Sequence, residues 1–563
     1  MNDWYRSVAT ASLPRLMTLL DTRPAPAGTG SFDRETWKYR LSRGNFSPPG
    51  FQSGCYAVAR ASHLDVPANP FSPESEWINH VRRGLDWSAR SQHADGSFPE
   101  WFPAQRSYCA TAYLLLYLAG AFRAVRGEIH RDESDRWSRM LLQAGHWLAE
   151  RDNPDSANQV AAAGAGFAAL GEVLDIASFR RRSEATWNRL LCRMAPAGWL
   201  PEYGGPDVGY MTASLDMAAR TLDRQHVESA EEAGTAMARY IAAVLAPGPC
   251  APLAAISSRS SNFFLPYGWE RFRRMNRPPA DSTRNYAVIM QGGFAPTPAS
   301  ADDRYFLQLF LPSFLDAALL PPAEDDRTDE PTLERPVDGF LRTPCYGFWI
   351  NLHGYGQFGA CSHQTPELLV DYGLAIVSRG TIHFPVGATS SSLTECPDAS
   401  FAAQNRWEVC GGWGESNEPF RLFRYLLRLA HLGGVTVPLS RPWSLLSERI
   451  RRTALLPGKI RISSGWKREV RTDHNAIEVR DALEFPARLS IDRVAFLAEP
   501  FPALHPASRF GTPQHPRMRP LDRQETETTL AGTLRDRGRA TLITRWELRE
   551  GSWCASRRIE AEG

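Results

Sequence analysis

Two tyrosines and two carboxylates share one short segment, GWLPEYGGPDVGY, at residues 198–210. They are Glu202, Tyr203, Asp207 and Tyr210. Apolar runs typical of helices flank the segment, and its Gly-Gly-Pro sequence cannot continue a helix. The chain must therefore turn sharply here and present polar side chains at the start of a helix. Side chains of these types can move protons or hold sugar hydroxyls, whereas a capped turn with packed tyrosines is the structural alternative.

Long helical runs joined by loops that contain glycine and proline surround this segment. Trp87, Trp147 and Trp187 recur at similar places in successive helical runs. A helical-pair period of about 40–60 residues predicts hairpins stacked into a solenoid or a closed ring. The runs at 110–120 and 161–171 are rich in alanine and glycine, which close helix packing requires. An irregular helical domain is the alternative.

The character of the chain changes after the helical runs. Residues 321–336 are acidic and rich in proline, without periodicity, and we interpret them as a linker. Residues 337–563 contain short segments that alternate apolar with polar side chains, a pattern that predicts an antiparallel sandwich. A helical insert is expected near 420–431. The predicted fold is a multidomain α+β protein, in which an incomplete (α/α) toroid with an extended N-terminal segment (1–320) precedes an antiparallel β-sandwich.

Composition excludes several classes of protein. The 64 basic and 62 acidic residues give a net charge of +2, which argues against a nucleic-acid binder or a membrane-surface protein. The nine cysteines are scattered singly, so neither a zinc ribbon nor a disulfide framework is indicated. We find no signal peptide or transmembrane segment, so we expect no membrane insertion and a cytoplasmic location by default. No phosphate loop or dinucleotide fingerprint is present, and no organic cofactor is predicted.

Several segments resemble the heparinase II/III-like family of polysaccharide lyases, and in particular members often found beside bacterial surface-polysaccharide genes. The resemblance extends from about Asp33 to the last predicted strands. It is carried by DGSFPEWFPAQRSYCATAYLL (95–115), DSANQVAAAGAGFAAL (155–170), GWLPEYGGPDVGYMT (198–212), SSRSSNFFLPYGWE (257–270) and GACSHQTPELLVDYG (359–373). It implies a helical toroid followed by a β-sandwich, and β-elimination on a sugar that carries a uronic acid.

In that reaction a base removes the proton alpha to the carboxylate, a neutralising group binds the carboxylate, and an acid protonates the leaving oxygen. The resemblance implies Tyr210 as base and acid, with nearby positive charge to stabilise its phenolate. It implies Asn158, together with arginine, as the neutralising group; a helix N-cap is the alternative for Asn158. Gln159 stands where the family usually has a histidine, and glutamine cannot accept a proton. Either Tyr210 performs both proton transfers, or the lyase reaction is lost or altered.

Further side chains are expected to bind the sugar. Arg106 follows the DGSF loop, and Arg259 lies in SSRSSNF; each is placed at the substrate groove, with a solvated surface charge as the alternative. The complete predicted substrate-binding set is Arg106, Arg259, Gln159, Glu202, Tyr203, Trp199 and His353. The predicted partner is an acidic polysaccharide or oligosaccharide.

A second histidine-containing segment lies in the C-terminal half. Where relatives carry His-x-His and an acidic residue, sometimes at a metal, this chain has Cys361 and His363 with Glu367 and Asp371 downstream. One histidine and one thiol give only weak support for a divalent ion near His363, and no metal site is predicted. We expect His363 to act as a catalytic proton carrier or as a donor to the sugar. A structural histidine is the alternative.

Other functions are also compatible with parts of the sequence. Residues 87–98 resemble the Gln/Trp signature of helical-ring terpenoid cyclases, but no DxDD cluster lies inside a helical hairpin. Gln92 is therefore interpreted as part of the ring architecture. A non-catalytic carbohydrate-binding or polysaccharide-assembly protein on the lyase scaffold is the stronger alternative. The replacement of expected histidines by Gln159 and Cys361 favours it.

Overall fold

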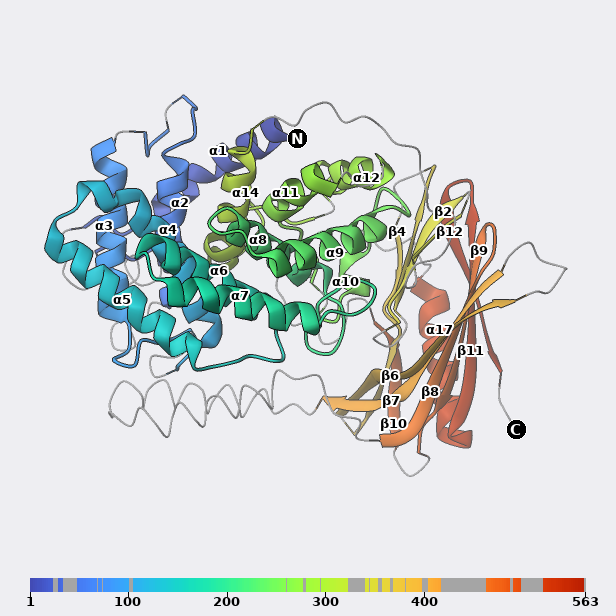
Figure 1. Cartoon of the computed structure of the whole chain (residues 1–563). Helices are drawn as coiled ribbons and strands as arrows, with labels where there is room; N and C mark the ends of the chain where they lie inside the picture. Colours follow the sequence, from blue (N-terminus) through green and yellow to red (C-terminus); the bar gives the residue numbers. More distant parts are fainter. Residues whose placement is uncertain are drawn as a thin grey trace.

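The computed structural model of the chain describes residues 1–23, 29–33, 48–67, 69–72, 74–100, 105–259, 261–276, 280–293, 295–321, 340–343, 345–352, 357–364, 368–379, 381–396, 404–416, 462–486, 490–497 and 520–560. The predicted helical insert near 420–431, almost all of the predicted linker and His353 lie outside these residues. Helices fill the N-terminal part and antiparallel sheets the C-terminal part, which confirms the predicted fold class (Figure 1).

The N-terminal part contains helices that alternate with short connections. Their bounds are α1 (Asn2–Leu19), α2 (Gly54–Ala61), α3 (Glu74–Ser91), α4 (Tyr108–Val125), α5 (Arg131–Ala149), α6 (Ala157–Val173), α7 (Ala177–Cys192), α8 (Val208–Leu222), α9 (Glu228–Leu245), α10 (Leu253–Ile256), α11 (Pro266–Asn276), α12 (Ala280–Gln291), α13 (Asp303–Tyr305) and α14 (Leu311–Ala318). The short helices η2 (Pro49–Ser53) and η3 (Arg126–Glu128) precede α2 and α5, and η4 (Phe306–Phe310), a π-helical turn, joins α13 to α14.

The inner helices pack in cyclic order. Helix α2 contacts α4, and α6, α8, α11 and α14 follow, each in contact with the next, until α14 returns to α2. Helices α4 and α6 are buried almost all round because the neighbouring helices of the ring and the outer helices cover them. A side chain at Gly164 would meet the Trp187 ring at 2.9 Å, so the small residues of α6 are needed for close packing. The stretch from α4 into η3 is long and apolar enough to cross a membrane, but most of it is buried within this ring.

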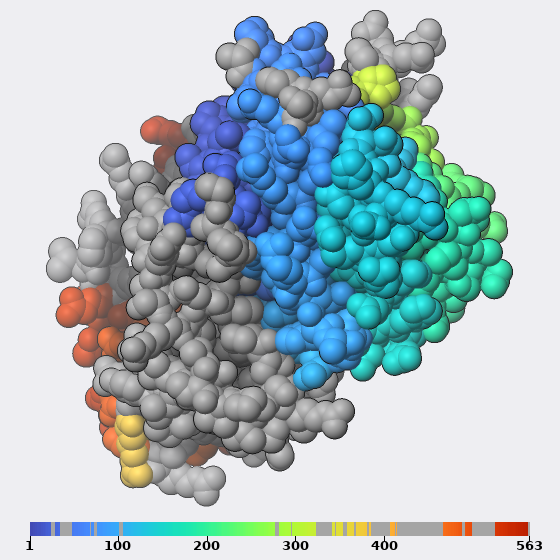
Figure 2. Space-filling view, turned by 90° about the vertical axis from the view of Figure 1, so that its left-hand side faces the viewer, coloured from blue at the N-terminus to red at the C-terminus, as the bar shows by residue number. Residues whose placement is uncertain are grey.

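The outer helices α3, α5, α7 and α9 each bury one face against the ring. Figure 2 shows the outer surface, where segments close in sequence lie side by side from blue to cyan. Gln92 ties neighbouring hairpins together, because its amide donates to the carbonyls of Gly96 and Met140, both at 2.9 Å. The Trp187 indole similarly donates to Thr221 of α8 at 3.0 Å. These contacts give Gln92 the architectural role expected from the sequence.

A buried charge centre joins the two ends of the ring. The Asp316 carboxylate on α14 accepts hydrogen bonds from Arg220 of α8 and from Tyr56 and Arg60 of α2. Arg220 is 1% exposed and Asp316 is 3% exposed. Removing one partner from such a buried pair leaves an uncompensated charge, which is strongly destabilising. The network therefore links α2, α8 and α14 where the ring closes.

The C-terminal part contains two antiparallel sheets. The small sheet has the order β1 (Phe340–Arg342), β2 (Tyr346–Ile350), β3 (Phe358–Ser362) and β4 (Leu368–Asp371). The eight-stranded sheet has the order β10 (Ile491–Phe496), β5 (Leu374–Ser378), β6 (Thr381–Cys396), β7 (Gln404–Ser416), β8 (Ile462–Thr472), β9 (Ala476–Glu484), β11 (Arg539–Arg549) and β12 (Ser552–Glu560). Helix α17 (Pro520–Arg537) precedes β11.

The small sheet lies between the helical ring and the large sheet. On one side, Phe348 packs against Trp407 of β7 with ring centroids 4.9 Å apart. On the other side, the Trp349 indole donates to the Val244 carbonyl of α9 at 2.7 Å. Because successive residues of a strand point to opposite faces, β2 can contact both neighbours at once. Helix α17 packs at the other end of the large sheet's buried face.

Candidate active site

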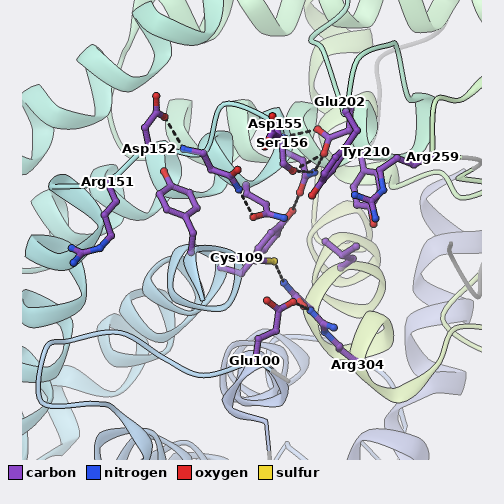
Figure 3. A pocket seen from close by; sticks show the side chains of 18 of the residues that line it. Glu100, Cys109, Arg151, Asp152, Asp155, Ser156, Glu202, Tyr210, Arg259 and Arg304 are labelled. Atoms are coloured by element: carbon purple, nitrogen blue, oxygen red, sulfur yellow. Dashed lines mark hydrogen bonds and ion pairs between the residues drawn. The ribbon is translucent and has the colours of Figure 1, made fainter. Parts of the chain in front are cut away.

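A cavity of about 430 Å³ lies among the first turns of the inner helices. Tyr108 begins α4, Asn158 lies in the first turn of α6, and Tyr210 lies in the first turn of α8; all three line the cavity. Helix N-termini carry partial positive charge and unpaired amide donors, which favour anions. The ring therefore directs three helix N-termini toward the same space. Figure 3 shows side chains that line this cavity, among them Ser156, Glu202 and Tyr210.

Asn158 is held firmly at one wall of the cavity. Its side-chain amide donates to Ser156 Oγ at 2.9 Å and to Glu202 Oε1 at 2.6 Å. Its carbonyl oxygen accepts from the Tyr113 hydroxyl at 3.0 Å, and its backbone amide donates to Glu202 Oε2 at 3.1 Å. Both amide hydrogens are thus engaged, and Asn158 can bind a ligand only by exchanging one of these bonds. Ser156, rather than Asn158, occupies the N-cap position of α6.

The Glu202 carboxylate holds Ser156 and Asn158 in place at this wall. It is 2% exposed, and its carboxylate accepts from Ser156 Oγ at 2.5 Å in addition to Asn158. Burial raises the pKa of Glu202 to about 7, although the bonds from Ser156 and Asn158 and the charge of Arg259 oppose the rise. The sequence places Glu202 among the substrate-binding residues, but its oxygens are committed to the protein. Its role in the structure is to hold Asn158.

Tyr210 and Arg259 are held close together by Asp207. Asp207 caps α8 by accepting from the Tyr210 backbone amide at 2.9 Å, and its other oxygen accepts from the Arg259 backbone amide at 3.0 Å. One carboxylate therefore fixes both residues. The Arg259 guanidinium lies 3.9 Å from the Tyr203 ring centroid and 5.8 Å from that of Tyr210. Tyr203 reaches this position with a left-handed backbone, at φ 53°.

Arg259 has no carboxylate partner among the described residues. Its Nε is buried and makes no hydrogen bond there, and the guanidinium lies over the ring of Tyr203. Burial lowers the pKa of Arg259, but the neighbouring Tyr210, Tyr203 and Glu202 outweigh this effect. The pKa therefore lies above its usual value, and the side chain is cationic. An unpaired cation on a cavity wall is a strong site for an anion, since arginine binds carboxylates in a bidentate manner.

The Tyr210 hydroxyl is protonated at neutral pH. Burial raises its pKa, neighbouring Tyr305 raises it further, and Arg259 opposes the rise. The hydroxyls of Tyr210 and Tyr305 lie 3.5 Å apart. Arg304, the residue before Tyr305, forms an ion pair with buried Glu100 at the cavity wall. Tyr210 therefore lies beside a second phenol in the cavity wall.

The cavity rim carries charges of both signs. Arg106 pairs with Asp95 at 2.5 Å and is about one-third exposed. Arg151 stacks on the Trp147 ring, 4.2 Å from its centroid. Gln159 accepts from the Asn153 amide at 2.7 Å, and its side chain lies at the cavity wall where a histidine was expected.

The structure brings together Tyr210, Asn158, Arg106, Arg259, Gln159, Glu202 and Tyr203, which all line this cavity. Trp199 does not line it; its side chain packs against the helical core.

His363 also does not line this cavity. It lies beyond β3 in the small sheet, and its Nε2 is 3.1 Å from the Thr343 carbonyl. Its backbone amide donates to the Cys345 carbonyl at 3.0 Å, and burial lowers the pKa of its ring. The geometry thus favours the structural alternative for His363, because the strand pairing directs it to its own sheet.

Several cavity residues were not predicted from the sequence, notably Tyr305, Arg304, Glu100 and Tyr113. A usable signal exists for Tyr305. Asp302 caps α13 and accepts from the Tyr305 amide at 2.9 Å, which repeats the Asp-x-x-Tyr arrangement of Asp207 and Tyr210. The π-helical turn η4 follows directly, and such turns are frequent at functional sites.

No group of three or more histidine, cysteine, aspartate or glutamate side chains arranged to hold a metal ion occurs in the part of the chain that the structure describes. Cys361 is buried in β3, and Glu367 lies outside the described residues.

No protein-family model and no curated protein matches the sequence. Among solved structures, the chain is similar to the chondroitin AC lyase of Streptomyces coelicolor A3 in complex with chondroitin sulphate, at 11% identity over 88% of this chain and 71% of that one, with a TM-score of 0.44. It is also similar to heparinase III, at 8% identity over 84% and 79% of the two chains, with a TM-score of 0.38. These similarities concern the course of the backbone and not individual side chains.

Proposed function

We propose that the protein is a polysaccharide lyase that cleaves a uronic-acid-containing polysaccharide by β-elimination in the cavity of the helical ring. The observation that supports this most directly is the pairing of Tyr210 with Arg259. A phenol that can exchange a proton lies beside a partly buried guanidinium that has no carboxylate partner among the described residues. The convergence of helix N-termini adds further attraction for an anionic sugar.

Arg259 is the first neutralising group in this scheme. A uronate carboxylate bound to its guanidinium withdraws charge from the adjacent carbon and makes its proton removable. Asn158 contributes by exchanging its bond to Ser156 or Glu202 for one to the same carboxylate. The bonds from the Tyr113 hydroxyl to the Asn158 carbonyl oxygen and from the Asn158 backbone amide to Glu202 hold the residue in place during this exchange.

Tyr210 carries the proton in both directions. The Tyr210 hydroxyl first loses its proton to solvent. The phenolate then takes the proton alpha to the carboxylate, the carbon–oxygen bond to the leaving sugar breaks, and the new Tyr210 hydroxyl protonates the leaving oxygen. The cycle returns the phenolate and yields an unsaturated uronide and a free hydroxyl. No other proton carrier is needed, which accommodates glutamine at position 159.

The test is incubation with polysaccharides that contain glucuronate, iduronate or mannuronate, followed by the ultraviolet absorbance of the new double bond. We expect Tyr210→Phe to abolish turnover while polymer binding changes little, because only a hydroxyl is removed. Tyr346→Phe is the control, since it removes a buried hydroxyl on β2, outside the cavity. Retained turnover in Tyr210→Phe would place the chemistry elsewhere.

A non-catalytic carbohydrate-binding role is the second candidate. Gln159 in the place of a proton carrier and the raised pKa of Tyr210 favour it. Its signature is measurable affinity for an acidic polysaccharide that depends on Arg259, with no unsaturated product from any polymer.

A further inference from the structure

Two buried cysteines meet where the helical ring touches the small sheet. Cys250 lies in the connection between α9 and α10, at residues 246–252, and Cys361 lies in β3. Both side chains are 0% exposed and belong to the same buried cluster of the helical core. The Cys361 thiol is hydrogen-bonded to the thiol and the backbone of Cys250. The backbones are close as well, because a side-chain carbon at Gly248 would lie 3.8 Å from the Cys361 Cβ.

The surface around this pair is tightly packed. Helices α9 and α10 lie on the side of the ring that faces the sheets (Figure 1). A side-chain carbon at Gly347 of β2 would meet the Pro247 carbonyl oxygen at 2.5 Å. One at Gly359 of β3 would meet the Pro252 ring, also at 2.5 Å. Glycines on both strands therefore let the α9–α10 connection lie directly on the sheet and hold the two cysteines against each other.

Another buried cysteine shows that burial alone does not bring thiols together. Cys55 on α2 is also 0% exposed, but its sulfur packs against α3, where a side-chain carbon at Gly84 would lie 2.3 Å from it. Burial raises the pKa of the Cys55 thiol. The pKa of the Cys361 thiol is raised by the hydrogen bond with Cys250 first and by burial second. The neighbour that distinguishes Cys361 is a second thiol.

We propose that Cys250 and Cys361 form a disulfide bond that joins the helical ring to the small sheet in an oxidising environment. Thiols in contact need only small side-chain rotations to bring their sulfurs to the bonding distance of about 2 Å. In a reducing environment both cysteines stay thiols and pack as small apolar side chains. The inference goes beyond the proposed function and stands whatever the cavity binds.

The bond forms by exchange with a small disulfide such as oxidised glutathione. The Cys250 thiol loses its proton, and the thiolate attacks one sulfur of the small disulfide, which releases one glutathione thiolate and leaves a mixed disulfide. The Cys361 thiolate then attacks the Cys250 sulfur and displaces the second glutathione. The released thiolates take up the two protons, so two protein thiols are oxidised and one small disulfide is reduced. Because both thiols are buried, the exchange requires the contact to open transiently.

The bond would fasten a segment of the chain that leads into the cavity. Helix α10 follows Cys250 and contacts β2 and β3, and Arg259 comes soon after it. Ser257, between the two, accepts from the Val208 backbone amide at 3.0 Å, which connects the segment to the start of α8. A cross-link at Cys250 therefore anchors to the small sheet the segment that carries Arg259.

The experiment is peptide mapping by mass spectrometry after oxidation of the purified protein. The protein is incubated with oxidised glutathione in urea just below the unfolding transition, so that the contact opens, and is then returned to buffer and alkylated. We expect a peptide pair joined through Cys250 and Cys361 that lacks the two thiol hydrogens. The exposed Cys192 and Cys554 show that the oxidant has acted. If these two have reacted while Cys250 and Cys361 are recovered as alkylated thiols, the inference is overturned.

The midpoint of thermal unfolding tests whether the bond ties the two parts together. The loop that it closes is on the order of 100 residues long, so oxidation should raise the midpoint by about 5 °C, and dithiothreitol should reverse the rise. Cys361→Ser and Cys250→Ser should each show no rise. The control Cys55→Ser, which also removes a buried thiol, should rise like wild type. A cross-linked peptide without this rise, or an equal rise in Cys361→Ser, would refute the proposed tie.

Discussion

Replacing Arg259 by methionine should lower turnover strongly while changing the free energy of unfolding little. The guanidinium has no ion pair to lose among the described residues, and its buried Nε makes no hydrogen bond there. Methionine keeps apolar contact with the Tyr203 ring, on which the arginine lies at 3.9 Å. We therefore expect the free energy of unfolding to change by no more than about 1 kcal/mol, as judged by urea denaturation.

The effect on turnover should be much larger. A hydrogen-bonded contact to a charged group contributes about 1.5–3 kcal/mol, and a carboxylate on arginine makes two. A loss of about 3 kcal/mol corresponds to a decrease in kcat/KM of about 100-fold. The measurement is the initial rate of unsaturated product at substrate concentrations well below KM.

Arg123→Met is the matched control. Arg123 lies on α4 outside the cavity lining, is 59% exposed, and pairs with Glu172. Its substitution should leave kcat/KM within about twofold of wild type, because a surface ion pair contributes little. The reasoning about Arg259 is refuted if its methionine variant retains kcat/KM within a few-fold of wild type. Strong destabilisation would show instead that the guanidinium is a structural charge.

Two further predictions concern the buried carboxylates Glu202 and Asp207. Burial raises the pKa of Glu202 to about 7, so its contribution to stability is complete below the unfolded pKa and is lost as pH rises through about 7. Wild type should lose about 3 kcal/mol from this group between pH 4 and 8, and Glu202→Gln should flatten the urea-unfolding profile over that range; an unchanged slope would contradict the raised pKa. Asp207→Ala should cost about 1–2 kcal/mol through the lost helix cap and slow turnover by displacing Tyr210 and Arg259. Asp207→Asn should keep most of the stability, and equal losses in both variants would argue against capping.

Local patterns in the sequence were enough for the architecture. The helical runs, the alanine- and glycine-rich inner helices and the alternating strands predict the toroid and the sandwich, because helix and strand periodicity are local properties. Gln92 could likewise be assigned to hairpin packing. The Gly-Gly-Pro turn placed Tyr210 at a helix start for the same reason.

The partners of these residues depend on tertiary structure. Tyr305 lies 95 residues from Tyr210 along the chain, and only closure of the ring by α14 brings the two hydroxyls together. The same closure directs Arg304 to Glu100, a contact that spans 204 residues. His363 has a suitable side chain, but the pairing of β3 holds it in its own sheet. Residue types and caps are thus determined by the sequence itself, whereas the fold decides which of them share one cavity, because long-range contacts leave no local pattern.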